Sequence, residues 1–123
     1  MAITYTTAVK NARLDAVVTI INSTGVLEIG TTGMGTVLAT INLGSPAGTS
    51  SGGVLTFSGF PRSDTAADNT GTAAAARIRT ASGGTDVITG LTVGLSASDI
   101  NLDSLSITAG QTVTITSATI THA

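Results

Sequence analysis

The stretch "GQTVTITSATITHA", residues 110–123, decides the fold class because it alternates threonine with β-branched apolar residues. This alternation has the period of two that is typical of a half-buried strand. Val113, Ile115 and Ser117 share one face, whereas Ala118 begins an apolar set on the other face. A strand changes phase in this way only with an extra residue, so we predict a β-bulge between Ser117 and Ala118.

Short extended segments separated by turns precede this strand. We expect further strands at residues 26–31, 35–43, 54–60, 72–81 and 85–94, and two short extended pieces within 97–110. Residues 44–53 and 61–71 are predicted to be loops, and "SGG" (82–84) is predicted to be a hairpin turn. About seven or eight short antiparallel strands at this spacing predict a mainly β protein, a jelly-roll-like β-sandwich in a single domain over residues 1–123.

Residues 7–22, "TAVKNARLDAVVTIIN", have the one helical pattern in the chain. The apolar positions at helical spacing are Leu14, Val17, Val18 and Ile21. Thr6 or Thr7 is suited to cap the start of this helix, and Gly25 is suited to end it. The β-branched residues in the stretch are also compatible with a strand. Residues 1–7 are expected to form an extended N-terminal arm.

The composition excludes several classes of function. Only 10% of the 123 residues are charged and the formal net charge is −2, so the chain lacks the basic surface that nucleic-acid binding requires. It contains no cysteine for disulfides or thiolate chemistry. No apolar run approaches the length of a membrane span, and the N-terminus does not resemble a signal peptide. We therefore expect a protein made in the cytoplasm that needs no cofactor.

The residues that catalysis would need are scarce. The one histidine, His122, is expected to be a frayed terminal residue. Glu28 is the one glutamate, and a pair with Asp15 or Asp86 would suit a glycosidase, but such pairs arise by chance in any small domain. Sugar binding also favours aromatic platforms, and the chain has only three aromatic residues. We expect a protein that is not an enzyme.

A weak calcium candidate lies in "DINLD", where Asp99, Asn101 and Asp103 offer oxygen ligands at alternate positions. Ser104 stands where a calcium loop requires glycine, and no glutamate occupies the twelfth position. Alternate polar residues are also typical of the solvent-facing side of a strand. The stretch therefore stays a candidate for metal binding, with a solvated strand as the alternative.

Arg77 and Arg79 are the leading candidates for contact with a partner. They share one face of the 72–81 strand, opposite Ala76 and Ile78. One interpretation is a solvated strand face that discourages aggregation, and the other is a contact with carboxylates on a partner surface.

Three further residues are candidates for partner binding. Arg62 is expected to pair with Asp64 or to make a second contact of the same kind as Arg77 and Arg79. Met34, between glycines on an expected loop tip, offers an adaptable apolar contact or folds back onto the core. Tyr5 lies in the predicted arm.

Three stretches resemble a group of small virion proteins of tailed bacteriophages. They are "NARLDAVVTIINSTGVLEI" (11–29), "GTAAAARIRTASGGTDVITGLTVG" (71–94) and "DINLDSLSITAGQTVTITSATITHA" (99–123), which together cover most of the chain. The chain is similar to the cement or decoration proteins on the outside of phage heads, a group without a catalytic signature. It departs from them in the tetra-alanine stretch 73–76, where larger or aromatic residues are expected.

The resemblance implies a non-enzymatic capsid cement protein that binds the major capsid protein on the outer surface of the virion. It also implies self-association as a dimer or trimer, with the terminal strand and the N-terminal arm adding to an exposed edge of a partner. Many equivalent sites would let a modest interface reinforce the whole shell. The alternative is a tail or baseplate component, with or without binding to a host surface.

Overall fold

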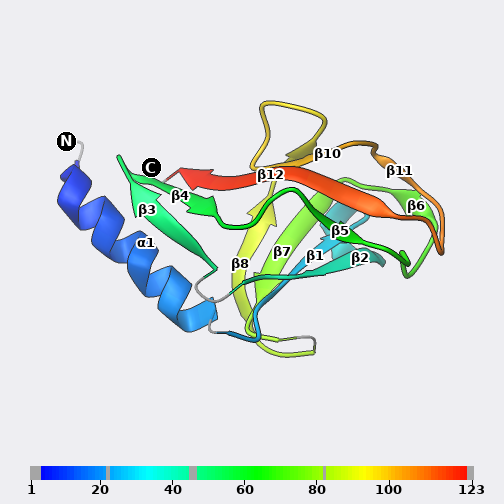
Figure 1. The fold of residues 1–123 in the computed structure, drawn as a ribbon, viewed down its shortest axis with the longest axis horizontal. Helices are drawn as coiled ribbons and strands as arrows, with labels where there is room; N and C mark the ends of the chain where they lie inside the picture. Colours follow the sequence, from blue (N-terminus) through cyan, green and yellow to red (C-terminus); the bar gives the residue numbers. More distant parts are fainter. Residues whose placement is uncertain (1–3, 22, 45–46, 82, 122–123) are drawn as a thin grey trace.

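The computed structural model describes residues 4–21, 23–44, 47–81 and 83–121, and it is mainly β with one α-helix (Figure 1). The elements follow in this order: α1 (Thr7–Ile21), β1 (Val26–Gly30), the 3-10 helix η1 (Thr32–Met34), β2 (Val37–Asn42), β3 (Gly48–Ser51), β4 (Val54–Phe57), β5 (Arg62–Asp64), β6 (Gly71–Thr72), β7 (Ala75–Arg79), β8 (Asp86–Leu91), β9 (Val93–Gly94), β10 (Ile100–Leu102), β11 (Ser106–Ile107) and β12 (Val113–Thr121).

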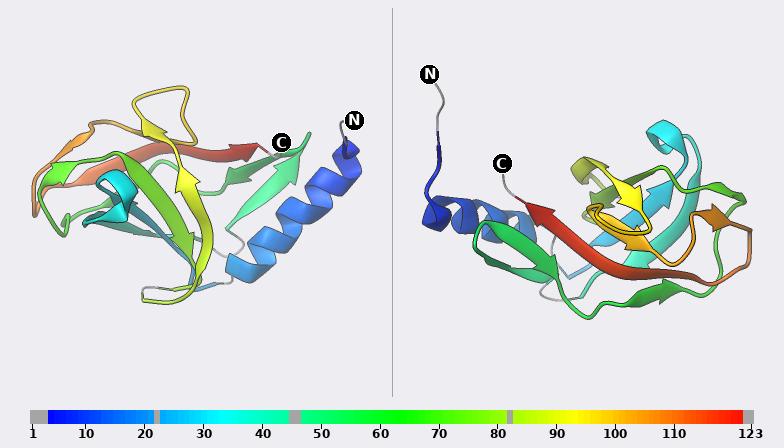
Figure 2. Two further views of the ribbon diagram at one scale, coloured as in Figure 1. Left: turned by 180° about the vertical axis from the view of Figure 1, so that it is seen from behind. Right: turned by 90° about the horizontal axis from the view of Figure 1, so that it is seen from above.

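The helical interpretation of the N-terminal segment is confirmed. Helix α1 buries Leu14 and Ile21, and its first turn is capped by Thr6, whose Oγ1 accepts a hydrogen bond from the Val9 amide at 3.4 Å. The helix lies against β3 and β4 and approaches β8 (Figure 2). It therefore covers one end of the molecule.

The strands form two larger sheets and one pair. The first sheet has the order β2-β1-β7-β8, and the second has the order β3-β4-β12-β10-β9, with β5 also paired to β12. The pair is β11 with β6, and all neighbours are antiparallel except β9 and β10. The predicted hairpin between the 72–81 and 85–94 segments is confirmed by the antiparallel pairing of β7 with β8.

Strand β12 is an interior strand of the second sheet. One edge pairs with β5 through Val113–Ile115 and then with β4 through Thr119–Thr121, while the other edge pairs with β10. Both edges of β12 therefore already have partners within the chain. The expectation that this strand adds to the edge of a partner is wrong for the described residues.

The predicted change of phase in β12 is confirmed, and the bulge lies slightly earlier than expected. Ser117 pairs with Asn101 and Ile115 pairs with Leu102, so Thr116 is the extra residue. The Thr116 hydroxyl donates to the Asn101 carbonyl at 3.1 Å. The bulge keeps Ala118 on the core side with Val113 and Ile115.

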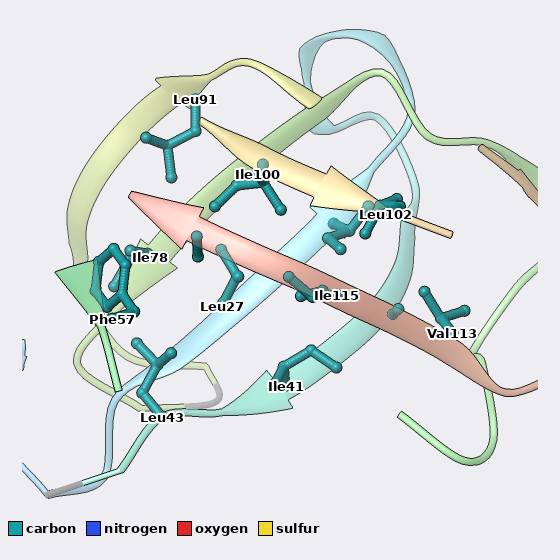
Figure 3. Packing of buried hydrophobic residues seen from close by; sticks show 14 of the residues in the cluster. Leu27, Ile41, Leu43, Phe57, Ile78, Leu91, Ile100, Leu102, Val113 and Ile115 are labelled. Atoms are coloured by element: carbon teal, nitrogen blue, oxygen red, sulfur yellow. The ribbon is translucent and has the colours of Figure 1, made fainter. Parts of the chain in front are cut away.

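One hydrophobic core lies between the two larger sheets (Figure 3). Leu27, Ile41, Ile78 and Leu91 come from the first sheet. The second sheet contributes Leu55, Phe57, Ile100, Leu102, Val113 and Ile115. Apart from Phe57, the buried side chains of this core are aliphatic, so the distance between the sheets is set by Val, Ile and Leu.

Two segments predicted to be loops contain strands. Residues 44–53 include β3, and residues 61–71 include β5. Both strands are polar and short, so no apolar alternation marks them in the sequence. Gly48 of β3 sits opposite Phe57, where a Cβ would collide with the carbonyl oxygen of Thr56. The described residues hold twelve strands rather than seven or eight, because several have only two or three residues.

Candidate interaction surfaces

Glu28 and Arg77 form a cross-strand ion pair on the outer face of the first sheet. They lie directly opposite each other on β1 and β7, and Arg77 Nε donates to Glu28 Oε1 at 2.6 Å. Arg79 Nη1 is 3.9 Å from the same oxygen. Glu28 is only 6% exposed, which makes this a largely desolvated pair in which the carboxylate depends on its arginine partners.

A second cross-strand pair joins Arg79 on β7 to Asp86 on β8. Arg79 Nε lies 2.8 Å from Asp86 Oδ1, but its N–H is not aligned for a hydrogen bond, so the contact is an ion pair alone. Glu28, Arg77, Arg79 and Asp86 together form a charge row with no net charge. The two arginines therefore have carboxylate partners in their own chain, which the sequence reasoning missed. Glu28 is distant in sequence, whereas Asp86 lies across the predicted hairpin and was not paired with Arg79 because the register of the hairpin was not worked out.

The arginine side chains of the charge row are partly exposed, at 21% for Arg77 and 22% for Arg79. Each guanidinium has five N–H donors, more than the carboxylates of the charge row accept. A contact between these arginines and a partner therefore stays a prediction, and it would add to a network that the chain has already ordered.

Arg62 does not pair with Asp64, contrary to expectation. Its Nε donates to the Ser58 carbonyl at 3.1 Å, its Nη1 donates to the Asn42 carbonyl at 3.3 Å, and its guanidinium lies 5.6 Å from the Phe60 ring centre. The Asp64 carboxylate instead accepts the amides of Thr40 and Ala66, each at 3.0 Å.

These contacts of Arg62 and Asp64 close the outer edge of β2, which would otherwise present unpaired backbone groups. They also line an open polar pocket of about 410 Å³ between β2 and β5.

Met34 and Tyr5 differ in their surroundings. Met34 is half-buried at the end of η1, and its thioether folds back over Gly30 of β1 rather than extending from a loop tip. Tyr5 is 41% exposed, and the Arg13 guanidinium lies over its ring at 4.4 Å from the centroid. A cation at this distance stabilises the ring position, so Tyr5 extends the outer surface of α1.

The side chains of the calcium candidate are largely engaged in holding a loop. Asp99 Oδ2 accepts the Thr92 amide at 3.0 Å. Asn101 Oδ1 accepts the Ser98 amide at 3.1 Å, and its Nδ2 donates to Ser117 Oγ at 2.9 Å. In the part of the chain that the structure describes, no group of three or more His, Cys, Asp or Glu residues could hold a metal ion. His122 lies outside the described residues.

Most carboxylates of the chain have a structural partner. Besides those of the charge row, Asp64 and Asp99, Asp15 accepts the Ser50 hydroxyl at 2.6 Å and Asp68 accepts the Thr40 hydroxyl at 3.4 Å. Six of the seven acidic side chains are thus bound to another group of the chain: Asp15, Glu28, Asp64, Asp68, Asp86 and Asp99. Acids held in this way stabilise turns and strand edges.

Exposed apolar side chains gather on the outer surface of α1. Val9 is 42% exposed and Ile20 is 57% exposed. These two residues, with Tyr5, Ala12, Arg13 and Ala16, form what we call the α1 outer face. Sequence reasoning missed this face. The signal was present, because apolar residues occur on both sides of the helix and not only in the buried stripe. The remaining large exposed apolar side chain among the described residues is Leu95, at 61%, between β9 and β10.

Comparisons with known proteins return nothing. No family model matches the chain, and neither the curated proteins nor the solved structures include a significant match. Among the described residues, the single α-helix is too short to cross a bilayer.

Proposed function

We propose that the protein is a non-enzymatic structural component of a virus particle. Its role is that of a cement or decoration protein, which binds the outer surface of a tailed-phage head and stabilises the major capsid protein lattice. The finer fold we propose for it is a jelly-roll-like sandwich. The sequence resemblance over most of the chain is the origin of this proposal.

The observation that supports the proposal is that nearly all acidic side chains bind other groups of their own chain. Six of the seven carboxylates bind backbone amides, hydroxyls or arginines of their own chain. Charged groups that hold turns and edges make a domain rigid, and a preorganised surface loses little entropy on binding. This arrangement suits a protein whose function is to present a fixed shape.

Self-association and lattice binding supply the mechanism. Each copy needs only a modest interface with the shell, because contacts among neighbouring copies raise the effective concentration at the next site. Binding to the assembled shell but not to its separated subunits shifts the equilibrium toward the assembled state. We propose that Arg62, Arg77, Arg79 and Tyr5 make the contacts with the shell and with the neighbouring copy.

The test is the copy number of the protein in purified virions. Quantitative mass spectrometry of its peptides, normalised to those of the major capsid protein, should give a ratio near one or a simple fraction of it. Absence from the virion overturns the proposal. A handful of copies per particle also overturns it and assigns the protein to the tail or baseplate.

A further inference from the structure

We infer that copies of this chain associate head to tail, with the α1 outer face of one copy against the acidic end of the next. The acidic end is the region of Asp64, Asp68 and Asp103. The inference concerns surfaces of the free protein and does not depend on where the protein acts.

The α1 outer face exposes apolar side chains, which favours contact with another protein surface over contact with solvent. A surface helix ordinarily has its polar residues on the exposed side. The exposed residues of α1 include an apolar set at helical spacing, Val9, Ala12, Ala16 and Ile20, which Arg13 joins. The polar residues Thr7, Asp15 and Thr19 are also exposed and flank this set. The two alanines lie between the two larger side chains, so a partner backbone can approach the middle of the helix closely. Truncating this face exposes no core, because Leu14 and Ile21 face the opposite way.

The two proposed surfaces lie at opposite ends of the molecule. Helix α1 packs on β3 and β4, and β4 pairs with the last residues of β12, Thr119–Thr121. Asp64 pairs with Val113 at the first residue of β12, and the Asp103 amide donates to Thr114. Strand β12 therefore separates them by most of its length, about 3.3 Å for each residue. Figure 1 shows α1 at one end and β6 and β11 at the other.

Asp68 belongs to the acidic end as well. Its neighbour Ala67 exchanges backbone hydrogen bonds with Gly110 and Gln111, just before β12 begins. Asp68 and Asp103 are exposed. Small side chains near Asp68 in the chain are exposed, among them Ala66 and Thr70, together with Asn69. The Ala109 amide donates to Thr70 Oγ1 at 2.9 Å, so exposed Ala109 lies beside this segment.

Charge favours a heterologous contact over a twofold one. The α1 end carries Lys10, Arg13 and Asp15, a net charge of +1, whereas the acidic end carries three carboxylates and Arg62, a net charge of −2. The charge row is neutral, and Asp99 lies beside Thr119 on the far side of β12 from β4. If two α1 helices met about a twofold axis near the helix centre, their Arg13 side chains would repel, whereas the acidic end attracts them.

A head-to-tail contact has a consequence for assembly. Because the two surfaces differ, a twofold dimer is excluded, and the copies close into a ring of three or more or extend as a filament. Self-association as a trimer is compatible with this contact, and self-association as a dimer is not.

The experiment uses two variants that each block one surface. Ile20→Asp places a charge in the α1 outer face, and the double variant Asp68→Lys, Asp103→Lys reverses the acidic end. Thr89→Asp, which adds the same charge at an exposed position of β8, is the matched control. Circular dichroism and urea unfolding establish that each variant folds, and sedimentation velocity over a range of concentrations measures association.

We expect wild type and Thr89→Asp to associate into species larger than a dimer, and each blocking variant alone to be monomeric. An equimolar mixture of the two blocking variants should form dimers and nothing larger, because one good surface of each kind remains. A monomeric wild type overturns the inference, as does association that Ile20→Asp leaves unchanged. So does a monomer that docks on purified phage heads through α1, which would make the shell the occupant. Virion copy number tests the proposed function separately, so the two failures are distinguishable.

Discussion

Glu28 Oε1 lies 2.6 Å from Arg77 Nε across two neighbouring strands, and Glu28 is nearly buried on the face of the sheet that points away from the core. A carboxylate in this position is poorly solvated, so its charge is stabilised mainly by the two arginines. Removing its charge leaves Arg77 and Arg79 next to each other without their shared acid.

We therefore expect Glu28→Gln to reduce the free energy of unfolding by about 1–3 kcal/mol, because a hydrogen bond between two charged groups is replaced by a weaker one to a neutral amide. Urea denaturation followed by circular dichroism measures the change. Asp86→Asn is the matched control, because the Asp86 side chain is 44% exposed and its ion pair is screened by solvent. Equal losses for the two variants would contradict the distinction between the buried and the exposed pair.

The bulge at Thr116 predicts an asymmetry between two deletions in β12. Removing Thr116 restores strict alternation and leaves Val113, Ile115 and Ala118 on one face, so we expect a folded protein of reduced stability. Removing Thr114 turns Val113 away from the core relative to Ile115, so we expect no cooperative unfolding transition. Thermal denaturation followed by circular dichroism distinguishes the two. A folded Thr114 deletion would show that the phase of β12 is not constrained by the core.

Two isoleucines test which apolar surface stabilises the monomer. Ile115 is fully buried, and Ile115→Ala should cost about 2–5 kcal/mol of unfolding free energy through the cavity it creates. Ile20→Ala, on the α1 outer face, should change the monomer by about 0.5 kcal/mol or less. Chemical denaturation at low protein concentration separates these values from any effect of association. A large loss for Ile20→Ala in the monomer would mean that α1 needs this side chain for its own packing.

Calcium should leave the protein unchanged. The Asp99 and Asn101 oxygens already accept backbone amides, so a cation would have to displace the hydrogen bonds that hold the 92–101 loop. We expect the same melting temperature in millimolar calcium and in a chelator. Asp99→Ala should lower the unfolding free energy by about 0.5–1.5 kcal/mol in both conditions. Ligand binding to the native state raises the melting temperature, so a calcium-dependent rise that Asp99→Ala abolishes would restore the metal site.

The head-to-tail contact should weaken with salt. The screening length falls from about 8 Å at physiological ionic strength to about 3 Å at one molar, which reduces the attraction between the α1 end and the acidic end. Sedimentation velocity should show smaller species at high salt for the wild type. Association that strengthens with salt would indicate an interface dominated by apolar contact without the charge complementarity.

The elements that could be predicted from the sequence are those in which the hydrophobic period is visible. The stripe of Leu14, Val17, Val18 and Ile21 indicated a helix, the candidate cap at Thr6 or Thr7 indicated its start, and the change of phase in β12 indicated the bulge. Strands β3 and β5 were missed because their residues are Gly, Ser, Thr, Arg and Asp, without apolar alternation. Such strands exist because neighbours pair with them, and pairing is not encoded in local periodicity.

The candidate contacts were harder to predict than the fold. Arg77 and Arg79 were identified as residues of interest, but their partner Glu28 lies 49 residues from Arg77, and only the order β1-β7 brings them together. Arg62 was expected to pair with its sequence neighbour Asp64, yet both groups instead satisfy backbone atoms around β2. Polar side chains of this kind bind the free backbone groups of edge strands, and the sequence alone does not show which strands lie at an edge.

The position of β12 between β4, β5 and β10 also determines when the molecule can be completed during translation. Strands β4, β5 and β10 emerge from the ribosome before β12, which pairs with all three. Until residue 121 has emerged, these strands therefore have unpaired edges, and the core side of the second sheet is incomplete. The sheet of β1, β2, β7 and β8 has all its strands much earlier and can form first. Pairing of β12 with β4 is therefore a late step between segments that are distant in sequence. Such long-range pairing is typically slow, and incomplete chains with unpaired strands are prone to aggregation.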